Sequence, residues 1–153
     1  LSTDVIVGFC GETEAQFQRT LDLLAQIRFD KVHVAAYSPR PGTVAWRHLE
    51  DDVPHDEKMR RLHAVEALQE GIGNEINRQL LGTTQEVLVE GERDGVLTGR
   101  TRTNKLVHFP GHSHLGRLVD VRIEKASPWA LQGLPVGSQV ALIGAPVGAP
   151  VSP

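Results

Sequence analysis

The stretch DVIVGFCGET, residues 4–13, decides the fold of the first half of the chain. Its β-branched run, Val5–Val7, is typical of a buried parallel strand. The two glycines that follow predict a tight turn. Thr13, with Gln16 three residues later, forms the capping-box pattern that starts a helix. The sequence here therefore predicts a strand, a turn and a helix in immediate succession.

The next segments continue this alternation. The predicted helix places four apolar residues on one face: Phe17, Leu21, Leu24 and Ile27. Residues 31–37 predict a second strand. Residues 38–43, Ser-Pro-Arg-Pro-Gly-Thr, predict a loop, because two prolines this close interrupt both helices and strands. The order strand, helix, strand predicts a βαβ unit with a parallel sheet.

Ligands of parallel sheets bind at the carboxyl ends of the strands. Here those ends are residues 8–12 and 37–43, so we predict that these two loops line a site. Ordinary turns with no binding role are the alternative interpretation of the same glycines and prolines.

A stripe of apolar residues spaced by three or four predicts one long helix from about Asp56 to Gln79, after a linker at residues 51–54. The stripe consists of Met59, Leu62, Val65, Leu68, Ile72, Ile76 and Leu80. We interpret it as core or as an interdomain seam, and Gly82 as the residue that closes the helix.

The second half of the chain predicts an all-β structure. Turn signals separate five candidate strands, at residues 85–90, 95–101, 106–109, 116–125 and 129–134. Five short strands predict a small closed barrel, a class that often binds single-stranded or looped nucleic acid on one face. The last residues, 143–153, are rich in Ala, Pro, Gly and Val without charge and predict a disordered tail.

A basic run lies within this second half. Residues 97–111 include Arg100, Arg102 and Lys105. If the run is a strand, Arg100 and Arg102 point to the same face, because side chains alternate along a strand. Two guanidinium groups on one face suit a phosphate clamp or a stacking platform for bases. A solvated strand face is an equally good interpretation from the spacing alone.

Composition limits the classes of function. The chain has 153 residues and a net charge of −3, which argues against binding nucleic acid through bulk charge. The charge is uneven: residues 1–77 carry 8 Lys and Arg against 13 Asp and Glu, whereas residues 78–153 carry 8 against 6. No apolar run is long enough to span a bilayer and no signal peptide is recognisable, so we expect a cytoplasmic protein that does not bind membranes.

Cysteine and histidine carry no predicted chemistry. The single cysteine, Cys10, excludes an internal disulfide and a cluster held by this chain alone. We interpret Cys10 as a small buried apolar residue. His108, His112 and His114 resemble a metal cluster by their number, but His112 and His114 lie in a loop after Pro110 and Gly111 with no cysteine or carboxylate nearby in the sequence. We therefore interpret this loop as solvated, with RNA contact as the weaker alternative, and predict no metal site.

Several segments resemble one family, the radical-SAM methylthiotransferases. Residues 4–13 are similar to the family's D-x-I-V-G-F-P-G-E-T segment, and residues 37–43 to its Y-S-P-R-P-G-T loop. Residues 87–91 and 97–111 resemble its RNA-binding TRAM domain. The run Gly-Arg-Thr-Arg-Thr-Asn-Lys at residues 99–105 resembles the bacterial branch that modifies tRNA.

This resemblance implies a fold of class α/β plus all-β. Residues 1–80 would hold the last βα units of a partial radical-SAM barrel and a linking helix. Residues 81–142 would form a five-stranded, OB-like TRAM barrel, followed by the tail. Because the chain begins directly in a strand-like run, we expect it to be the C-terminal part of something longer, and we expect the unpaired sheet edge to lower its solubility.

The resemblance also implies a reaction. The family's tRNA branch adds a methylthio group to C2 of N6-isopentenyladenosine beside the anticodon. It uses S-adenosylmethionine as the methyl donor and radical source, and two 4Fe-4S clusters. The family's C-x-x-x-C-x-x-C motif is absent here, so the clusters would be bound by residues outside this chain, and we expect the chain alone to be inactive. The implied partners are the tRNA anticodon stem-loop, an electron donor and a sulfur source, and we expect a monomer.

Two sets of residues follow from the resemblance, and neither contains a catalytic residue or a metal ligand. The rim of the S-adenosylmethionine or substrate site would consist of Gly8, Gly11, Glu12, Tyr37, Ser38, Pro39, Arg40, Gly42 and Thr43. The RNA contacts would be Arg100, Thr101, Arg102, Asn104 and Lys105. Arg40 would contact a carboxylate or phosphate, with pairing to a nearby Asp as the alternative. Glu12 has the alternative of serving the helix N-terminus.

Two other functions stay open at this point. One is a stand-alone TRAM module that binds RNA without catalysis, which the βαβ unit disfavours. The other is the branch of the family that modifies a ribosomal-protein aspartate, which the run at residues 99–105 disfavours.

Overall fold

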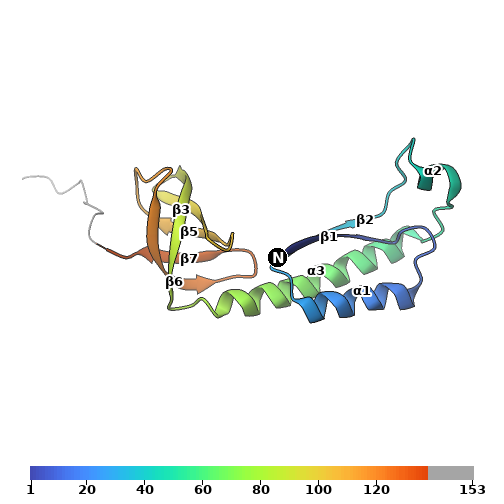
Figure 1. Cartoon of the computed structure of the whole chain (residues 1–153), viewed down its shortest axis with the longest axis horizontal. Helices are drawn as coiled ribbons and strands as arrows, with labels where there is room; N and C mark the ends of the chain where they lie inside the picture. The colour runs from blue at the N-terminus through green and yellow to red at the C-terminus, as the bar shows by residue number, and fades with distance from the viewer. Residues whose placement is uncertain (138–153) are drawn as a thin grey trace, which may run out of the picture. The chain divides into compact units, whose positions relative to one another are not determined.

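The computed structural model describes residues 1–137, which form two compact units. Within the described residues, the first unit contains Leu1–Leu80 together with Ala126–Trp129, and the second contains Leu81–Lys125 and residues 130–137. Figure 1 shows their elements in order along the chain. The predicted tail, residues 143–153, lies outside the described residues.

The first unit begins with the predicted βαβ arrangement. Strand β1 (Ser2–Val7), helix α1 (Glu14–Ile27) and strand β2 (Lys31–Ala36) follow one another, and β1 pairs with β2 in parallel. The capping box is also confirmed. The Thr13 hydroxyl accepts a hydrogen bond from the Gln16 backbone N–H, and the Gln16 side chain accepts one from the Thr13 N–H.

Two further helices follow. A short helix, α2 (Val44–His48), comes directly after the predicted loop and was not predicted; its N-cap is Thr43, whose hydroxyl accepts from the Trp46 N–H. Helix α3 (His55–Arg78) lies within one residue of its predicted bounds. Gly82 does not cap this helix, which already ends at Gln79. Its positive φ of 76° instead turns the chain toward the barrel, where its N–H donates to the Ile123 carbonyl.

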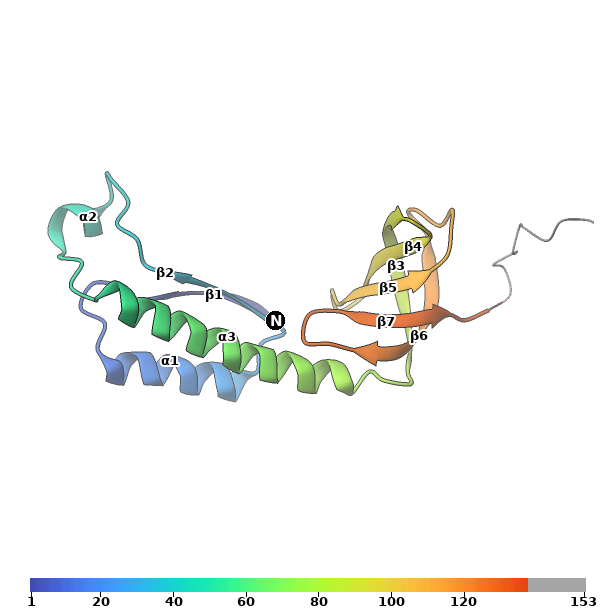
Figure 2. The ribbon, with the colours of Figure 1, turned by 180° about the vertical axis from the view of Figure 1, so that it is seen from behind.

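The core of the first unit lies between the sheet and the two long helices. Figures 1 and 2 show α1 and α3 side by side on one face of the β1–β2 sheet. Four buried side chains form this core: Val7, Phe17, Leu24 and Val65. Burying a side chain of this size contributes about 1.5–3 kcal/mol. The expectation of a fully buried strand at Val5–Val7 was wrong: Ile6 is 60% exposed, because the opposite face of the sheet is uncovered within the described residues.

The apolar stripe predicted for α3 describes only part of its buried face. Val65 and Ile72 are buried as predicted, but so are four polar side chains: Lys58, Arg61, Gln69 and Asn77. Oδ1 of Asn77 is buried without a hydrogen-bond partner among the described residues, but the other polar ends bond mainly to neighbouring loops. The Gln69 amide, for example, donates to the carbonyls of Phe29 and Asp30. Helix α3 is therefore held by hydrogen bonds as well as by apolar contacts.

The second unit is the predicted closed five-stranded barrel (Figure 2). Its strands are β3 (Thr84–Arg93), β4 (Val96–Thr101), β5 (Leu106–Pro110), β6 (Leu118–Ala126) and β7 (Leu131–Pro135), in the spatial order β3-β4-β5-β7-β6. β5 and β7 pair in parallel, whereas β3 pairs antiparallel with both β4 and β6. The interior is filled by Val87, Val89, Leu97, Val107, Phe109, Val121, Ile123 and Leu131.

One glycine is required by the closeness of two strands. A Cβ added at Gly99 on β4 would lie 2.3 Å from the Leu88 carbonyl oxygen and 2.7 Å from Cγ1 of Val87. Real Cβ atoms do not approach a backbone oxygen so closely. The strands β3 and β4 can therefore keep their spacing only while residue 99 has no side chain.

We predict that Gly99→Ala destabilises the barrel by about 1–3 kcal/mol, the range typical of overpacking, because a backbone strand must move. Hydrogen exchange of the barrel amides measures this destabilisation directly. Gly91→Ala on the neighbouring strand is the control, since a Cβ there meets nothing within 4 Å. An equal decrease of protection in the two variants would contradict the prediction.

Candidate functional site

The carboxyl ends of β1 and β2 bring the two predicted loops to one edge of the sheet. The Tyr37 N–H donates to the Val7 carbonyl at 2.8 Å. The rings of Phe9 and Tyr37 then meet edge to face, with their centroids 4.9 Å apart. Residues 8–12 and 37–43 are therefore neighbours in space, although α1 separates them in the sequence.

Glu12 fixes the first of these loops. Its carboxylate accepts from the Gly8 N–H at 2.6 Å and from the Arg61 guanidinium at 2.7 Å. Arg61 is only 4% exposed and also donates to the Glu12 carbonyl at 2.9 Å. Thr13 and Gln16 make the capping hydrogen bonds of the helix, whereas the Glu12 carboxylate bonds to Gly8 and Arg61. It holds the loop on α3 through a buried ion pair.

A second buried cation supports the Tyr37 side of the edge. The Lys58 ammonium pairs with the Asp51 carboxylate at 2.5 Å and lies 5.2 Å from the centroid of the Tyr37 ring. Partial desolvation, a hydrogen bond with the Cys10 side chain and the charges of Cys10 and Asp51 raise the pKa of the Tyr37 phenol. Cys10 is half-buried rather than buried, and it interacts with this phenol.

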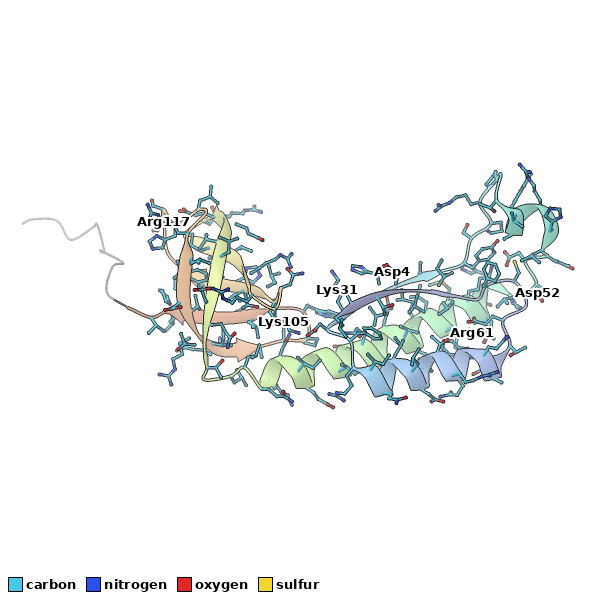
Figure 3. The ribbon with its side chains drawn as sticks, viewed as in Figure 1. Asp4, Lys31, Asp52, Arg61, Lys105 and Arg117 are labelled. Atoms are coloured by element: carbon cyan, nitrogen blue, oxygen red, sulfur yellow. The ribbon has the colours of Figure 1, made fainter. Side chains whose placement is uncertain are left out.

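Sequence reasoning missed these supporting residues. Asp52 belongs with them, because its carboxylate accepts from the Gly11 N–H at 2.7 Å. Figure 3 shows Asp52 and Arg61 at the same end of the first unit. The long helix was predicted from its apolar positions alone. That pattern does not indicate that two charged side chains, Lys58 and Arg61, are also buried.

The exposed part of the edge is the segment from Ser38 to Thr43. Arg40 is exposed, and within residues 1–137 its guanidinium takes part in no ion pair, so the alternative of pairing with a nearby Asp does not occur there. Its carbonyl accepts from the backbone N–H and the hydroxyl of Thr43, which shapes the loop. Pro39 and Gly42 are exposed beside it. The segment thus offers a guanidinium to a carboxylate or phosphate.

The barrel carries a separate groove of about 390 Å³. It brings together four of the five predicted RNA-binding residues, Arg100, Thr101, Arg102 and Asn104; Lys105 is not among the residues that line it. The other lining residues were not predicted: Glu86, Leu88, Glu90 and Leu118. Figure 3 shows Lys105 and Arg117 far apart on the barrel.

The two arginines reach this groove by different routes. The predicted strand at residues 95–101 ends where β4 ends, at Thr101, so Arg102 lies in the turn that follows and the two arginines do not share one strand. The Thr101 hydroxyl accepts from the Lys105 N–H at 3.1 Å, and Asn104 adopts a left-handed conformation with φ of 65°. This tight turn curls Arg102 back toward β3.

Each guanidinium in the groove already has a carboxylate partner. Nε of Arg100 lies 3.3 Å from Oε2 of Glu90, and Nη2 of Arg102 lies 2.7 Å from Oε1 of Glu86. Arg100 also donates to the side chain and the carbonyl of Asn104, both at 3.4 Å. The groove therefore carries two positive and two negative charges, not a purely basic surface. Alternation along β3 places residues 86, 88 and 90 on one face, and this signal could have revealed the carboxylates.

In the loop that was expected to be solvated, the His112 side chain is exposed but bonded to the barrel, whereas His108 lies on β5 with its Nδ1 3.1 Å from the Thr98 hydroxyl. Nδ1 of His112 lies 2.8 Å from Oε1 of Glu92, and the Ser113 N–H donates to the same carboxylate. The hydrogen bond from His112 is the main cause that lowers the pKa of Glu92. Within residues 1–137, no three His, Cys, Asp or Glu side chains are grouped as metal ligands, and no helix is long and apolar enough to cross a membrane.

Two arginines at the start of α3 change the pKa of the neighbouring Glu57. Hydrogen bonds from Arg60 and Arg61 lower the pKa of Glu57 to about 2, the larger effect coming from Arg60. The stabilisation from this carboxylate is therefore present above its ordinary pKa and is lost as the pH falls toward 2. An NMR titration of the Glu57 carboxyl carbon checks the value. Arg60→Ala should raise the pKa toward 4.5, whereas Arg19→Ala, on the exposed face of α1, should not change it. A Glu57 pKa that does not respond to Arg60→Ala would contradict this cause.

Comparison with known proteins gives a domain family for the second unit and relatives for most of the chain. Residues 78–136 match the TRAM domain family. The chain is 51% identical over 139 residues to the tRNA-2-methylthio-N(6)-dimethylallyladenosine synthase of Chloroflexus aurantiacus, covering 88% of this chain and 30% of that protein. The identity is 48% over 134 residues with the protein of the same name from Aquifex aeolicus, covering 87% and 30%.

A third relative of the same name, from Chromobacterium violaceum, is 47% identical over 145 residues, covering 92% of this chain and 32% of that protein. The chain spans about 30% of the length of the curated relatives it matches. The matched stretch contains the βαβ unit and the barrel together. Residues 78–136 are thus a TRAM domain, and over the region it shares with these relatives the chain belongs to the methylthiotransferase family that its loop and strand motifs resemble.

Proposed function

We propose that this chain contributes the tRNA-binding barrel and part of the substrate-site rim to a tRNA methylthiotransferase. The reaction would add a methylthio group to C2 of N6-isopentenyladenosine beside the anticodon. The observation that carries the proposal is that a single stretch of the relatives, about 30% of their length, aligns with both units of this chain. A stand-alone RNA-binding module would not need the βαβ unit, and the relatives are named for tRNA rather than for a ribosomal protein.

The two implied cofactors fit this chain differently. A 4Fe-4S cluster does not fit, because the chain has one cysteine and residues 1–137 contain no group of three ligands. We therefore assign no step through a cluster to these residues. S-adenosylmethionine fits better, since its carboxylate suits the unpaired guanidinium of Arg40. When bound, it supplies the methyl group and, by reductive cleavage, a carbon radical.

The residues of the edge would divide into two roles. Glu12, held by Arg61, and Tyr37, backed by Lys58, would keep the loops rigid. Gly8 and Gly11, whose N–H groups donate to Glu12 and Asp52, would shape the first loop from within. The exposed rim residues would approach the ligand through backbone and small side chains: Ser38, Pro39, Gly42 and Thr43. Arg40 would orient a carboxylate or phosphate by a two-pronged hydrogen bond.

The barrel would bind the anticodon stem-loop through its groove. Arg102 is the most accessible cation there, with 81% of its side chain exposed. An exposed ion pair of this kind is worth about 0–1 kcal/mol, so a phosphate can replace Glu86 as its partner. The proposed RNA contacts also include three other groove residues and their neighbour in the sequence: Arg100, Thr101, Asn104 and Lys105.

We predict that the double variant Arg100→Ala, Arg102→Ala weakens binding of the tRNA. The logarithm of the affinity should also fall less steeply with the logarithm of the salt concentration, by about 0.7–0.9 for each phosphate that the variant no longer neutralises. Titrations of tRNA at several salt concentrations measure both effects. Arg93→Ala is the control, because Arg93 is 92% exposed and pairs with its neighbour Asp94 at the far end of β3. An unchanged slope in the double variant would contradict the proposed RNA contacts.

A further inference from the structure

The groove of the barrel has a floor as well as charged walls. Leu88 and Leu118 lie opposite each other on β3 and β6, and they are 42% and 58% exposed. Leu88 also lies opposite Arg100 on β4. Two exposed leucines between charged side chains form an apolar surface that suits the flat face of a base rather than a phosphate.

The carboxylates of the groove require an explanation. A site that binds only phosphates gains nothing from negative side chains, because like charges repel. Glu86 has a clear structural role, since its 2.7 Å contact holds Arg102. Glu90 is different: its side chain is 46% exposed, its contact with Nε of Arg100 is 3.3 Å long, and no hydrogen bond to its carboxylate occurs within residues 1–137. Its oxygens therefore keep free capacity to accept hydrogen bonds.

Glu90 and Arg100 together distinguish the bases by the hydrogen-bond donors and acceptors that each base offers. An ionised carboxylate only accepts, and a guanidinium only donates. Guanine is the base that offers two adjacent donors, N1–H and N2–H₂, and also two acceptors, O6 and N7, which pair well with arginine. Adenine, cytosine and uracil each present a single donor group to a carboxylate. Guanine thus satisfies both side chains at once.

We propose that the groove binds one unpaired guanine of the RNA. The base lies on Leu88 and Leu118, its Watson–Crick edge donates to Glu90, and its O6 and N7 accept from Arg100. Arg102, which Glu86 positions in the free chain, exchanges this partner for a neighbouring phosphate. This inference rests on the proposed tRNA binding and deepens it by naming the base that the barrel reads.

The test uses the full chain and short uridine-rich RNAs that carry one central guanine, inosine or adenine. Inosine lacks only the N2 amine of guanine. Fluorescence anisotropy should give about fivefold tighter binding for the guanine RNA than for the inosine RNA, the lower end of the discrimination that a two-pronged base contact provides. Equal affinity of the wild-type chain for the two RNAs would overturn the proposal.

The variant Glu90→Gln should reduce the guanine-to-inosine ratio to about one while the chain stays folded. Glu124→Gln is the matched control, because it removes the same charge from an exposed position of β6 outside the groove. It should leave the ratio unchanged. If Glu90→Gln instead tightens binding of every RNA by the same factor, Glu90 merely competes with phosphates and the guanine assignment is wrong.

The outcomes separate this inference from the proposed function. Failure of the wild-type chain to bind tRNA would overturn both. Binding of tRNA that is weakened in the double arginine variant, but without preference for guanine, would overturn only the guanine site. Because the readout is a ratio between two RNAs on the same variant, a general decrease in stability does not imitate it.

Discussion

The buried ion pair between Arg61 and Glu12 is the contact on which the first unit depends. Taking two charges out of water is unfavourable unless the geometry is good and the remaining hydrogen-bonding groups are satisfied. Here Arg61 donates to the Glu12 carboxylate and carbonyl and to Glu57, and it lies 5.4 Å from the Phe17 ring. The Gly8 N–H completes the set. One side chain on α3 thereby fixes the loop that follows β1 and the start of α1.

The barrel uses the same chemistry at a different degree of burial. The pairs Arg100–Glu90 and Arg102–Glu86 stand in an open groove, where water weakens them and partners can exchange. The Arg61–Glu12 pair is enclosed and serves to hold a loop. Similar side chains thus form a permanent contact in one unit and an exchangeable contact in the other, and solvent access decides between the two.

Local patterns predicted most of the elements but not the contacts between them. The capping box at Thr13, the strand alternation and the glycine turns each act over a few residues, so the sequence reveals them directly. Arg61 and Glu12 are 49 positions apart, and hydrophobic periodicity gives no weight to a buried arginine. The end of the strand at Thr101 was predicted correctly, but the turn that brings Arg102 to Glu86 was not, because it depends on the left-handed conformation of Asn104. The roles of the rim residues were predicted from the resemblance to the family. The structure adds only that the two loops, residues 8–12 and 37–43, lie next to each other.

Closure of the barrel has a consequence for how a ligand is accommodated. β3 is hydrogen-bonded on both sides, to β4 and to β6, and its spacing from β4 leaves no room for a side chain at Gly99. A strand fixed in this way cannot slide to improve its fit, so little conformational entropy remains for the protein to lose on association. If the groove binds RNA as proposed, the loss of conformational freedom is borne by the RNA, whose bases must unstack before they enter. Loops that are already open should therefore associate faster than helical segments of the same sequence.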